Sequence, residues 1–180
     1  MPSRLRTDLK DATPAHAGRR PAITLEPLAA DAVPGEVTRL YKAAFPARER
    51  LPIADRLCWE SGFRMQANHS FCGLAFVSTC NGIAWLLFFA IVEELRCQGL
   101  GTQALECLEE RYPGHRFIID VEAADPQAPN LAERQRRLAF WQRNGFQEAH
   151  FGFHWRGEHY SFLVKGGSLT DAEVRQFWER

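Results

Sequence analysis

Residues 83–102 read IAWLLFFAIV-EELRCQGLGT, an apolar run followed by a charged segment that contains glycines. More than half of the apolar run is β-branched or aromatic, and Asn81-Gly82 precedes it, which is typical of a strand buried on both faces. The glycines then open a predicted helix from Thr102 to Tyr112. Because unpaired backbone N–H groups point outward at a helix N-terminus, this stretch predicts an anion site, and the anion we expect is a phosphate.

The length and composition of the chain indicate one folded domain. The 180 residues are 46% apolar, enough for one well-filled core. Residues 1–20 are rich in Arg, Asp, Thr, Ala and Pro without periodicity, and such a segment buries too little apolar surface to offset the entropy of ordering. We therefore expect a disordered tail over residues 1–20 and a single domain over residues 21–180.

Charge and cysteine content limit the partners and the compartment. Lys and Arg number 22, as do Asp and Glu, so no bulk charge favours nucleic acid or an anionic membrane. The five cysteines are an odd number without a CxxC pair, which indicates reduced thiols and a cytoplasmic location. The apolar run is about half as long as a membrane span, and the N-terminus lacks an apolar signal core. We expect neither a membrane span nor secretion.

The remaining pattern alternates strands and helices. Predicted strands cover Ile23–Glu26, Phe63–Ser70, Phe71–Thr79, Ile83–Val92 and Phe117–Glu122, followed by a hairpin over Phe146–Val164 that turns at Arg156-Gly157. Predicted helices cover Val37–Phe45, Pro52–Trp59, Thr102–Tyr112 and Asn130–Asn144, and Thr170 caps a closing helix. Antiparallel strands precede the glycine turn, and the strand, helix and strand around it predict one parallel crossover.

The glycine turn has two interpretations. Gly99 to Ala104 reads GLGTQA, which matches the dinucleotide fingerprint GxGxxG/A, and Asp120 lies where a ribose-binding acid would be expected. However, Glu93–Gln98 separates the strand from the first glycine, whereas the glycine of a dinucleotide site follows its strand almost at once. Too few strand–helix units follow to build a doubly wound sheet. We rank a dinucleotide-binding oxidoreductase as the less favoured interpretation.

Two motifs resemble one family. Residues 96–101, RCQGLG, resemble the (Q/R)xxGx(G/A) signature of the GNAT acyl-CoA N-acyltransferases, and residues 140–146, FWQRNGF, resemble the later FYxxxGF segment of that family. One strand and one helix separate the motifs, as in the family, and the resemblance covers roughly Ile23–Val164. It implies an α+β GNAT fold, with a mixed, mostly antiparallel sheet that has a central parallel strand pair and is flanked by helices.

The resemblance implies that acetyl-CoA is the co-substrate. The implied pyrophosphate site is the backbone of Arg96, Cys97, Gln98, Gly99, Leu100, Gly101 and Thr102, where glycines without a Cβ, the helix dipole and one arginine favour an anion. The pantetheine arm would pair with Ala90, Ile91 and Val92. Arg143 would contact a CoA phosphate. A bulge near Ala90–Ile91 would splay the parallel strands, leave a backbone N–H for the oxyanion, and place the thioester between Phe89–Val92 and Asp120–Glu122.

The chain departs from the family pattern at two positions. Cys97 stands where relatives frequently have glycine, at a position that varies within the signature. Trp141 stands where many relatives have a tyrosine that protonates the leaving thiolate, and indole cannot supply that proton. Either another group or water replaces it, or CoA leaves unprotonated, since a thiol has a pKa near 8.5. Trp141 also motivates an alternative function, a catalytically weak CoA-binding domain with a regulatory or interaction role.

The predicted reaction is transfer of acetyl from acetyl-CoA to a primary amine by direct attack in a ternary complex. The attacking amine must be neutral, which calls for a carboxylate or a water chain as base. Asp120 and Glu122 point to the same side of one strand, and Glu122, nearer the strand end, is the first candidate for the base; the alternative is a carboxylate bonded to loop backbone or to an arginine. Glu49 is predicted to bind a cationic acceptor, with a solvated charge as the alternative.

The acceptor and the partners are less defined by the sequence. A small-molecule or peptide amine is expected as acceptor, and a homodimer is left open. His154 and His159 are predicted to be cross-strand neighbours, which supplies two metal ligands without a third, so we expect no metal site. Arg134, Arg136 and Arg137 are interpreted first as a solvated face and second as a contact for a CoA phosphate, with nucleic acid a distant third.

Overall fold

A computed structural model describes residues 22–179, which form a seven-stranded sheet in the order β1-β2-β3-β4-β5-β7-β6. Neighbouring strands run antiparallel except β4 and β5, which are parallel. The predicted mostly antiparallel sheet with one central parallel pair is confirmed. The strands are β1 (Ile23–Pro27), β2 (Ser61–Ala67), β3 (Ser70–Cys80), β4 (Ile83–Ile91), β5 (Arg116–Glu122), β6 (Gln147–Trp155) and β7 (Glu158–Lys165).

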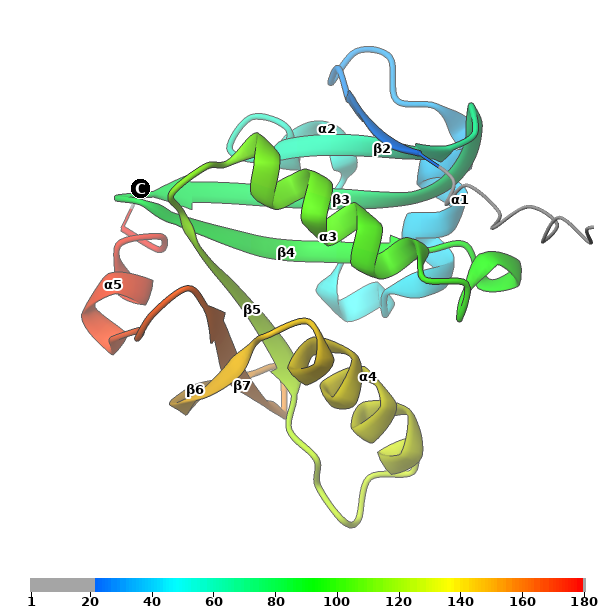
Figure 1. Cartoon of the computed structure of the whole chain (residues 1–180). Coiled ribbons are helices and arrows are strands. Elements are labelled where there is room, and N and C mark those ends of the chain that lie inside the picture. Colours follow the sequence, from blue (N-terminus) through cyan, green and yellow to red (C-terminus); the bar gives the residue numbers. More distant parts are fainter. Residues whose placement is uncertain (1–21, 180) are drawn as a thin grey trace, which may run out of the picture.

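Helices cover both faces of the sheet (Figure 1). The helices are α1 (Gly35–Ala44), α2 (Ile53–Arg56), α3 (Leu100–Arg111), α4 (Leu131–Arg143) and α5 (Asp171–Arg175), with single 3-10 turns at η1 (Ala47–Glu49) and η2 (Glu93–Leu95). The apolar face of α3 packs with Trp141 of α4 on one side of the sheet. Apolar residues of α1 and α2 pack on the opposite side, against Leu74 and Phe76. The core is therefore divided into layers by the sheet.

Tight turns explain how the antiparallel strands pair. Asn81 and Gly82 have φ values of 45° and 75°, so the predicted hairpin between β3 and β4 is confirmed. Asn68 and His69, with φ values of 49° and 64°, form a second turn of this kind. The sequence placed the strand boundary after Ser70 instead. A histidine at positive φ is uncommon, because its Cβ is strained there, and it therefore gives little signal of a turn.

Several helix ends differ from the prediction. Helix α3 begins at Leu100, two residues early, because Gly99 adopts a left-handed φ of 80° and directs the chain into the helix. Helix α2 ends at Arg56, short of the predicted Trp59. The predicted cap of the closing helix is confirmed, since the Thr170 hydroxyl accepts the Glu173 N–H in a capping box.

The two parallel strands separate soon after they meet. They pair only at Ile83–Arg116, Ala84–Phe117 and Trp85–Ile118. In the β3–β4 ladder, Val77 pairs with Leu86 and Phe76 with Phe88, so Leu87 is an extra residue. The expected bulge at Ala90–Ile91 was wrong in position, since these residues keep regular register with β3. An extra residue increases the local twist of a strand, and at Leu87 it turns β4 away from β5.

Two sequence-based alternatives are answered by the fold. The sheet of residues 22–179 has a single parallel pair, so it is not the doubly wound parallel sheet that a dinucleotide fold requires. Within the same residues, no helix has both the length and the apolar character needed to cross a membrane. The predicted tail over residues 1–20 lies outside the described residues, as do both ends of the predicted domain range, residues 21 and 180.

Candidate active site

A cleft of about 1620 Å³ opens where β4 and β5 diverge. One end, which we call the glycine end, is the turn from Arg96 to Thr102 that enters α3. The other, the carboxylate end, contains Glu49 of η1 and Asp120 and Glu122 of β5. The divergence after Trp85 thus exposes both strands to one continuous space.

The glycine end presents backbone N–H groups. Among the described residues, the backbone N–H groups from Cys97 to Thr102 have no backbone hydrogen-bond acceptor. The next N–H group along the chain, that of Gln103, donates to the Gly99 carbonyl at 3.2 Å. Cys97 has a φ of 61°, which a side chain disfavours. This backbone conformation explains why a glycine suits that position.

Two further features shape the glycine end for an anion. A Cβ at Gly101 would come within 3.1 Å of the Phe140 ring carbons, so only glycine leaves the helix start uncovered there. Arg96 and Arg143 both line the cleft, and the Arg96 Nε also donates to the Ile91 carbonyl at 3.1 Å. Free N–H groups, a helix start and arginines fit a pyrophosphate.

The predicted CoA-contacting residues do not all face the cleft. Those that line it are Ala90, Ile91, Arg96, Cys97, Gly99, Gly101, Thr102 and Arg143. Leu100 is buried in the core, and the Gln98 amide donates to the Glu94 carbonyl. Both lie on the turn without a side chain in the cleft, which leaves their backbone N–H groups as the possible contribution.

The end of β4 also has limited backbone capacity. The Val92 N–H donates to the Cys72 carbonyl of β3 at 2.9 Å. Because hydrogen-bonded pairs alternate along an antiparallel ladder, the N–H groups of Phe89 and Ile91 point away from β3, toward β5. Of the predicted segment Ala90–Val92, Ile91 is thus the residue whose N–H is best placed for a ligand in the gap.

Asp120 lies at the carboxylate end, beside an indole. Its Oδ1 accepts the Trp85 Nε1–H at 2.8 Å. Burial raises the pKa of the Asp120 carboxyl to about 6, and the Glu49 carboxylate adds to the rise, while the hydrogen bond from Trp85 opposes it. A carboxylate with such a pKa is ionised at neutral pH and still basic enough to accept a proton.

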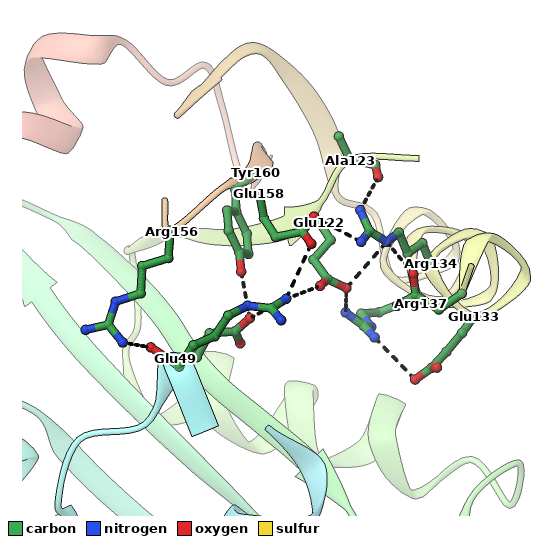
Figure 2. A network of polar contacts seen from close by, with 11 residues as sticks. Glu49, Glu122, Ala123, Glu133, Arg134, Arg137, Arg156, Glu158 and Tyr160 are labelled. Carbon is green, nitrogen blue, oxygen red and sulfur yellow. Dashed lines mark hydrogen bonds and ion pairs between the residues drawn. The ribbon is translucent and has the colours of Figure 1, made fainter. Parts of the chain in front are cut away.

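Glu122, two residues on, has very different surroundings (Figure 2). Its oxygens lie 3.4 Å from Arg48 Nη2, 3.2 Å from Arg137 Nη1 and 3.7 Å from Arg134 Nε. Its side chain is 8% exposed. Three guanidinium groups already pair with this carboxylate, so the contacts of Glu122 favour the alternative of an arginine-bonded carboxylate over a base.

Glu49 is bound to the body of the protein. Its Oε1 accepts the Tyr160 hydroxyl at 2.6 Å and lies 3.8 Å from Arg48 Nη2. Its side chain is 19% exposed, so Glu49 is more enclosed than a solvated loop charge. Burial and this carboxylate raise the pKa of Tyr160 far above its usual range, and the phenol stays protonated as a hydrogen-bond donor.

Arginine pairs join η1, β5, α4 and β7 into one polar network (Figure 2). Glu158 contacts Arg48 at 3.6 Å and Arg134 at 3.0 Å, and Arg156 donates to the Arg48 carbonyl. Arg134 also donates to the Ala123 carbonyl and is 7% exposed. The interpretation of Arg134 as part of a solvated face was therefore wrong, whereas Arg136 is exposed.

Sequence reasoning missed the partners in this network. Arg134 and Arg137 are three residues apart on α4, a spacing that places both on one helix face and is the only local signal of their shared role. Their partner Glu122 lies on another element, and Glu158 on a third. Trp85 was read only as core, although its N–H reaches Asp120.

The remaining predicted residues occupy ordinary positions. Trp141 is buried, with its ring 5.7 Å from that of Phe89 and 5.2 Å from that of Phe146. His154 and His159 face each other across the hairpin as predicted, with ring centroids 4.7 Å apart. Within residues 22–179, no three His, Cys, Asp or Glu side chains form a group that could hold a metal.

Comparisons of the fold agree with this geometry. A protein of Bacteroides thetaiotaomicron assigned to the GNAT acetyltransferases superposes with a TM-score of 0.62 at 20% identity, covering 78% of this chain and 84% of that one. A GNAT acetyltransferase from Elizabethkingia anophelis with acetyl-CoA bound gives 0.58 at 16% identity, covering 81% and 99%. An acetyltransferase from Bacillus subtilis in complex with CoA gives 0.58 at 16%, covering 84% and 100%. At these identities the likeness shows the fold.

The sequence comparison shows the family. No curated protein sequence matches the chain significantly. Residues 36–146, which include both motifs and both ends of the cleft, match the family described as the acetyltransferase (GNAT) family. The chain therefore belongs to the GNAT family of acetyltransferases.

Proposed function

We propose that the protein transfers the acetyl group of acetyl-CoA to a primary amine of a small molecule or a peptide, by direct attack within a ternary complex. The observation that carries the proposal is the cleft that connects the glycine end to the half-buried Asp120. One end suits a pyrophosphate and the other holds a base, so donor and acceptor can meet where β4 and β5 diverge.

The five cysteines are free thiols, which supports a cytoplasmic setting.

In this proposal the glycine end holds the donor. The pyrophosphate binds the N–H groups from Cys97 to Thr102, with charge from Arg96 and Arg143. The pantetheine arm extends along β4, where the Ile91 N–H faces the gap. The N–H of Phe89 or Ile91 then stabilises the negative charge that develops on the thioester oxygen.

The proposed base is a carboxylate of β5. A base removes one proton from the ammonium, and the neutral nitrogen bonds to the acetyl carbon. The carbon–sulfur bond then breaks, so that CoA leaves as a thiolate, and the positively charged nitrogen releases its second proton to water to give the neutral amide. The contacts favour Asp120 over Glu122, because within residues 22–179 no arginine forms an ion pair with Asp120, and its pKa is raised. Glu122 as a base stays a prediction, and its contacts support a positioning role toward Arg48 and Arg137.

Trp141 does not prevent this reaction. The indole is buried among aromatic rings and offers no acidic hydroxyl. A thiolate with a pKa near 8.5 is a good leaving group without prior protonation. The reaction therefore needs no acid at position 141 to protonate the leaving group.

The test is release of CoA thiol from acetyl-CoA in the presence of a panel of primary amines, with the acetylated product identified by mass spectrometry. We expect turnover with at least one amine, and Glu49→Gln should raise the amine KM about tenfold with the acetyl-CoA KM unchanged, because a charged contact to the ammonium is lost. Binding of acetyl-CoA without turnover of any amine would instead support the CoA-binding regulatory domain.

A further inference from the structure

Four aromatic side chains follow one another along the wall of the carboxylate end. We call Trp85, Trp178, Phe153 and Tyr160 the aromatic row, and all four line the cleft. The ring centroids of Trp85 and Trp178 lie 6.1 Å apart, those of Trp178 and Phe153 5.7 Å, and those of Phe153 and Tyr160 5.3 Å. β4, β6, β7 and the segment after α5 each contribute one ring.

Each end of the aromatic row carries a carboxylate. The Trp85 indole donates to Asp120 at 2.8 Å, and the Tyr160 hydroxyl donates to Glu49 at 2.6 Å. An ionised carboxylate offers about four lone-pair sites, so both groups keep capacity to accept further hydrogen bonds. A primary ammonium brings three donors and matches that capacity.

The nearby cations are already engaged with the protein. Arg56 is buried and donates to the Tyr41 hydroxyl, the Glu60 carboxylate and the Glu49 carbonyl. Arg48 lies closer to Glu122 and Glu158, at 3.4 and 3.6 Å, than to Glu49, at 3.8 Å. Arg50 donates to the Lys42 carbonyl. The carboxylates of Glu49 and Asp120 are therefore the groups at this end with most acceptor capacity left for a ligand.

The aromatic row is also partly open to solvent. Trp178 is 54% exposed although it lies against Trp85 and Phe153. An exposed indole that lines a cleft presents a flat apolar surface, and such a surface favours contact with another ring. The same wall thus offers an apolar platform with negative charge at both ends.

We propose that the acceptor is an arylalkylamine, with its ring on the aromatic row and its ammonium between Glu49 and Asp120. This inference rests on the proposed function, since it names the amine that the same cleft acetylates. A polyamine fits less well, because its second ammonium would need a further free carboxylate, and Glu122 and Glu158 are paired with arginines.

The test compares primary amines that differ in the group that carries the amine. We would measure kcat/KM for 2-phenylethylamine, tryptamine, 2-cyclohexylethylamine, 1,4-diaminobutane and an alanyl tripeptide at saturating acetyl-CoA. The two arylalkylamines should exceed the diamine and the peptide at least tenfold, and 2-phenylethylamine should exceed its cyclohexyl analogue about fivefold. A preference for the diamine or the peptide, or equal rates for phenyl and cyclohexyl amines, would overturn the inference.

A pair of tryptophan variants locates the contact. Trp178→Ala should raise the arylalkylamine KM about tenfold and leave the acetyl-CoA KM unchanged, whereas Trp59→Ala, which removes an indole that is 76% exposed and does not line the cleft, should change neither. Equal effects of the two variants would place the ring elsewhere and refute the assignment.

The outcomes separate this inference from the proposed function. Acetylation of the diamine or the peptide alone would retain the function and refute the arylalkylamine. Calorimetric titration with acetyl-CoA runs beside the assay; failure to bind acetyl-CoA would refute the function itself, and the inference with it.

Discussion

The glycine end and the carboxylate end of the cleft are built in different ways. The glycine end is made by consecutive residues, and its functional groups are backbone N–H groups set by the conformation of Cys97, Gly99 and Gly101. The carboxylate end is made by side chains from distant segments, since Tyr160 and Glu49 are 111 residues apart. A backbone site can therefore be recognised from a short sequence motif, whereas a side-chain site forms only when folding brings distant segments together. The two ends should respond separately to substitution.

The largest expected effect is at the carboxylate end. Asp120→Asn should lower kcat about 100- to 1000-fold, because the amide cannot take the proton that a general base removes, while its oxygen can still accept the Trp85 N–H. The acetyl-CoA KM should stay within twofold. Steady-state kinetics with a fixed amine checks both values, and a variant that retains a fifth of the wild-type kcat would exclude Asp120 as the base.

A substitution at the glycine end should instead weaken the binding of acetyl-CoA. Gly101→Val should raise the Kd for acetyl-CoA at least tenfold, because a Cβ there already meets the Phe140 ring at 3.1 Å and a larger group would displace that ring. Calorimetric titration measures this, with Gly35→Ala on α1 as the control outside the cleft. If Gly101→Val bound acetyl-CoA normally and lost amine turnover instead, the assignment of the two ends would be reversed.

The pH dependence should report on the carboxylate end alone. Asp120 acts as a base only when ionised, and its pKa is about 6, so kcat should fall as the pH drops through 6 and reach about a tenth of its plateau at pH 5. The groups that face Asp120 are Trp85, Glu49 and Arg56. The Kd for acetyl-CoA should not follow this curve.

A histidine could imitate this pH profile, because imidazoles titrate in the same range. His154 lines the cleft, so His154→Gln is the matched control. It should keep the fall of kcat at low pH, which we call the acidic limb. Asp120→Asn should lose it. An acidic limb that disappears with His154 and persists without Asp120 would contradict the assignment.

The smallest expected effects are changes in the free energy of unfolding, which should differ in sign between the two carboxylates of β5. The pKa of Asp120 is raised in the folded state, so ionisation favours unfolding, and stability is lost as the pH rises from about 4 to about 6. Asp120→Asn should then increase the free energy of unfolding by about 1 to 2 kcal/mol at pH 8, less than the full shift because the residue is half-buried. Glu122→Gln should decrease it by about 1 to 3 kcal/mol, because three arginines lose their counter-charge.

Urea denaturation of both variants at pH 8 measures these changes. We expect kcat of Glu122→Gln to stay within about fivefold of wild type, since its proposed role is to position Arg48 and Arg137. A hundredfold loss of kcat with unchanged stability would restore Glu122 as the base.

Much of the fold could be predicted because its signals are local. The apolar run of β4, the Asn81-Gly82 turn and the glycines before α3 each act within a few residues. The bulge at Leu87 could not be predicted in position, because it lies inside a uniform apolar run where every residue suits a buried strand equally well. The Asn68-His69 turn was missed because one of its residues is atypical of left-handed backbone.

The candidate site was predictable to the level of the strand. The period of two along β5 brings Asp120 and Glu122 to one side, and the cleft includes both. The period of two cannot tell which carboxylate is free of arginine contacts, because those arginines come from other segments. Arg48 lies 74 residues from Glu122 in the sequence, and Arg137 lies 15 residues from it. Only one pair of the aromatic row is local, since Phe153 and Tyr160 face each other across the β6–β7 hairpin, and Trp85 and Trp178 come from distant segments.

The short seam between β4 and β5 has a mechanical consequence. Three residue pairs join the two parts of the sheet, from Ile83–Arg116 to Trp85–Ile118, and each part is internally paired along most of its length. The seam has fewer residue pairs than any other strand pair of this sheet, and we expect it to act as a hinge. We expect backbone amides beyond the hinge, such as that of Ile91, to exchange with solvent faster than those of β3, and a ligand that bridges both strands to slow them together by joining two cooperative units into one.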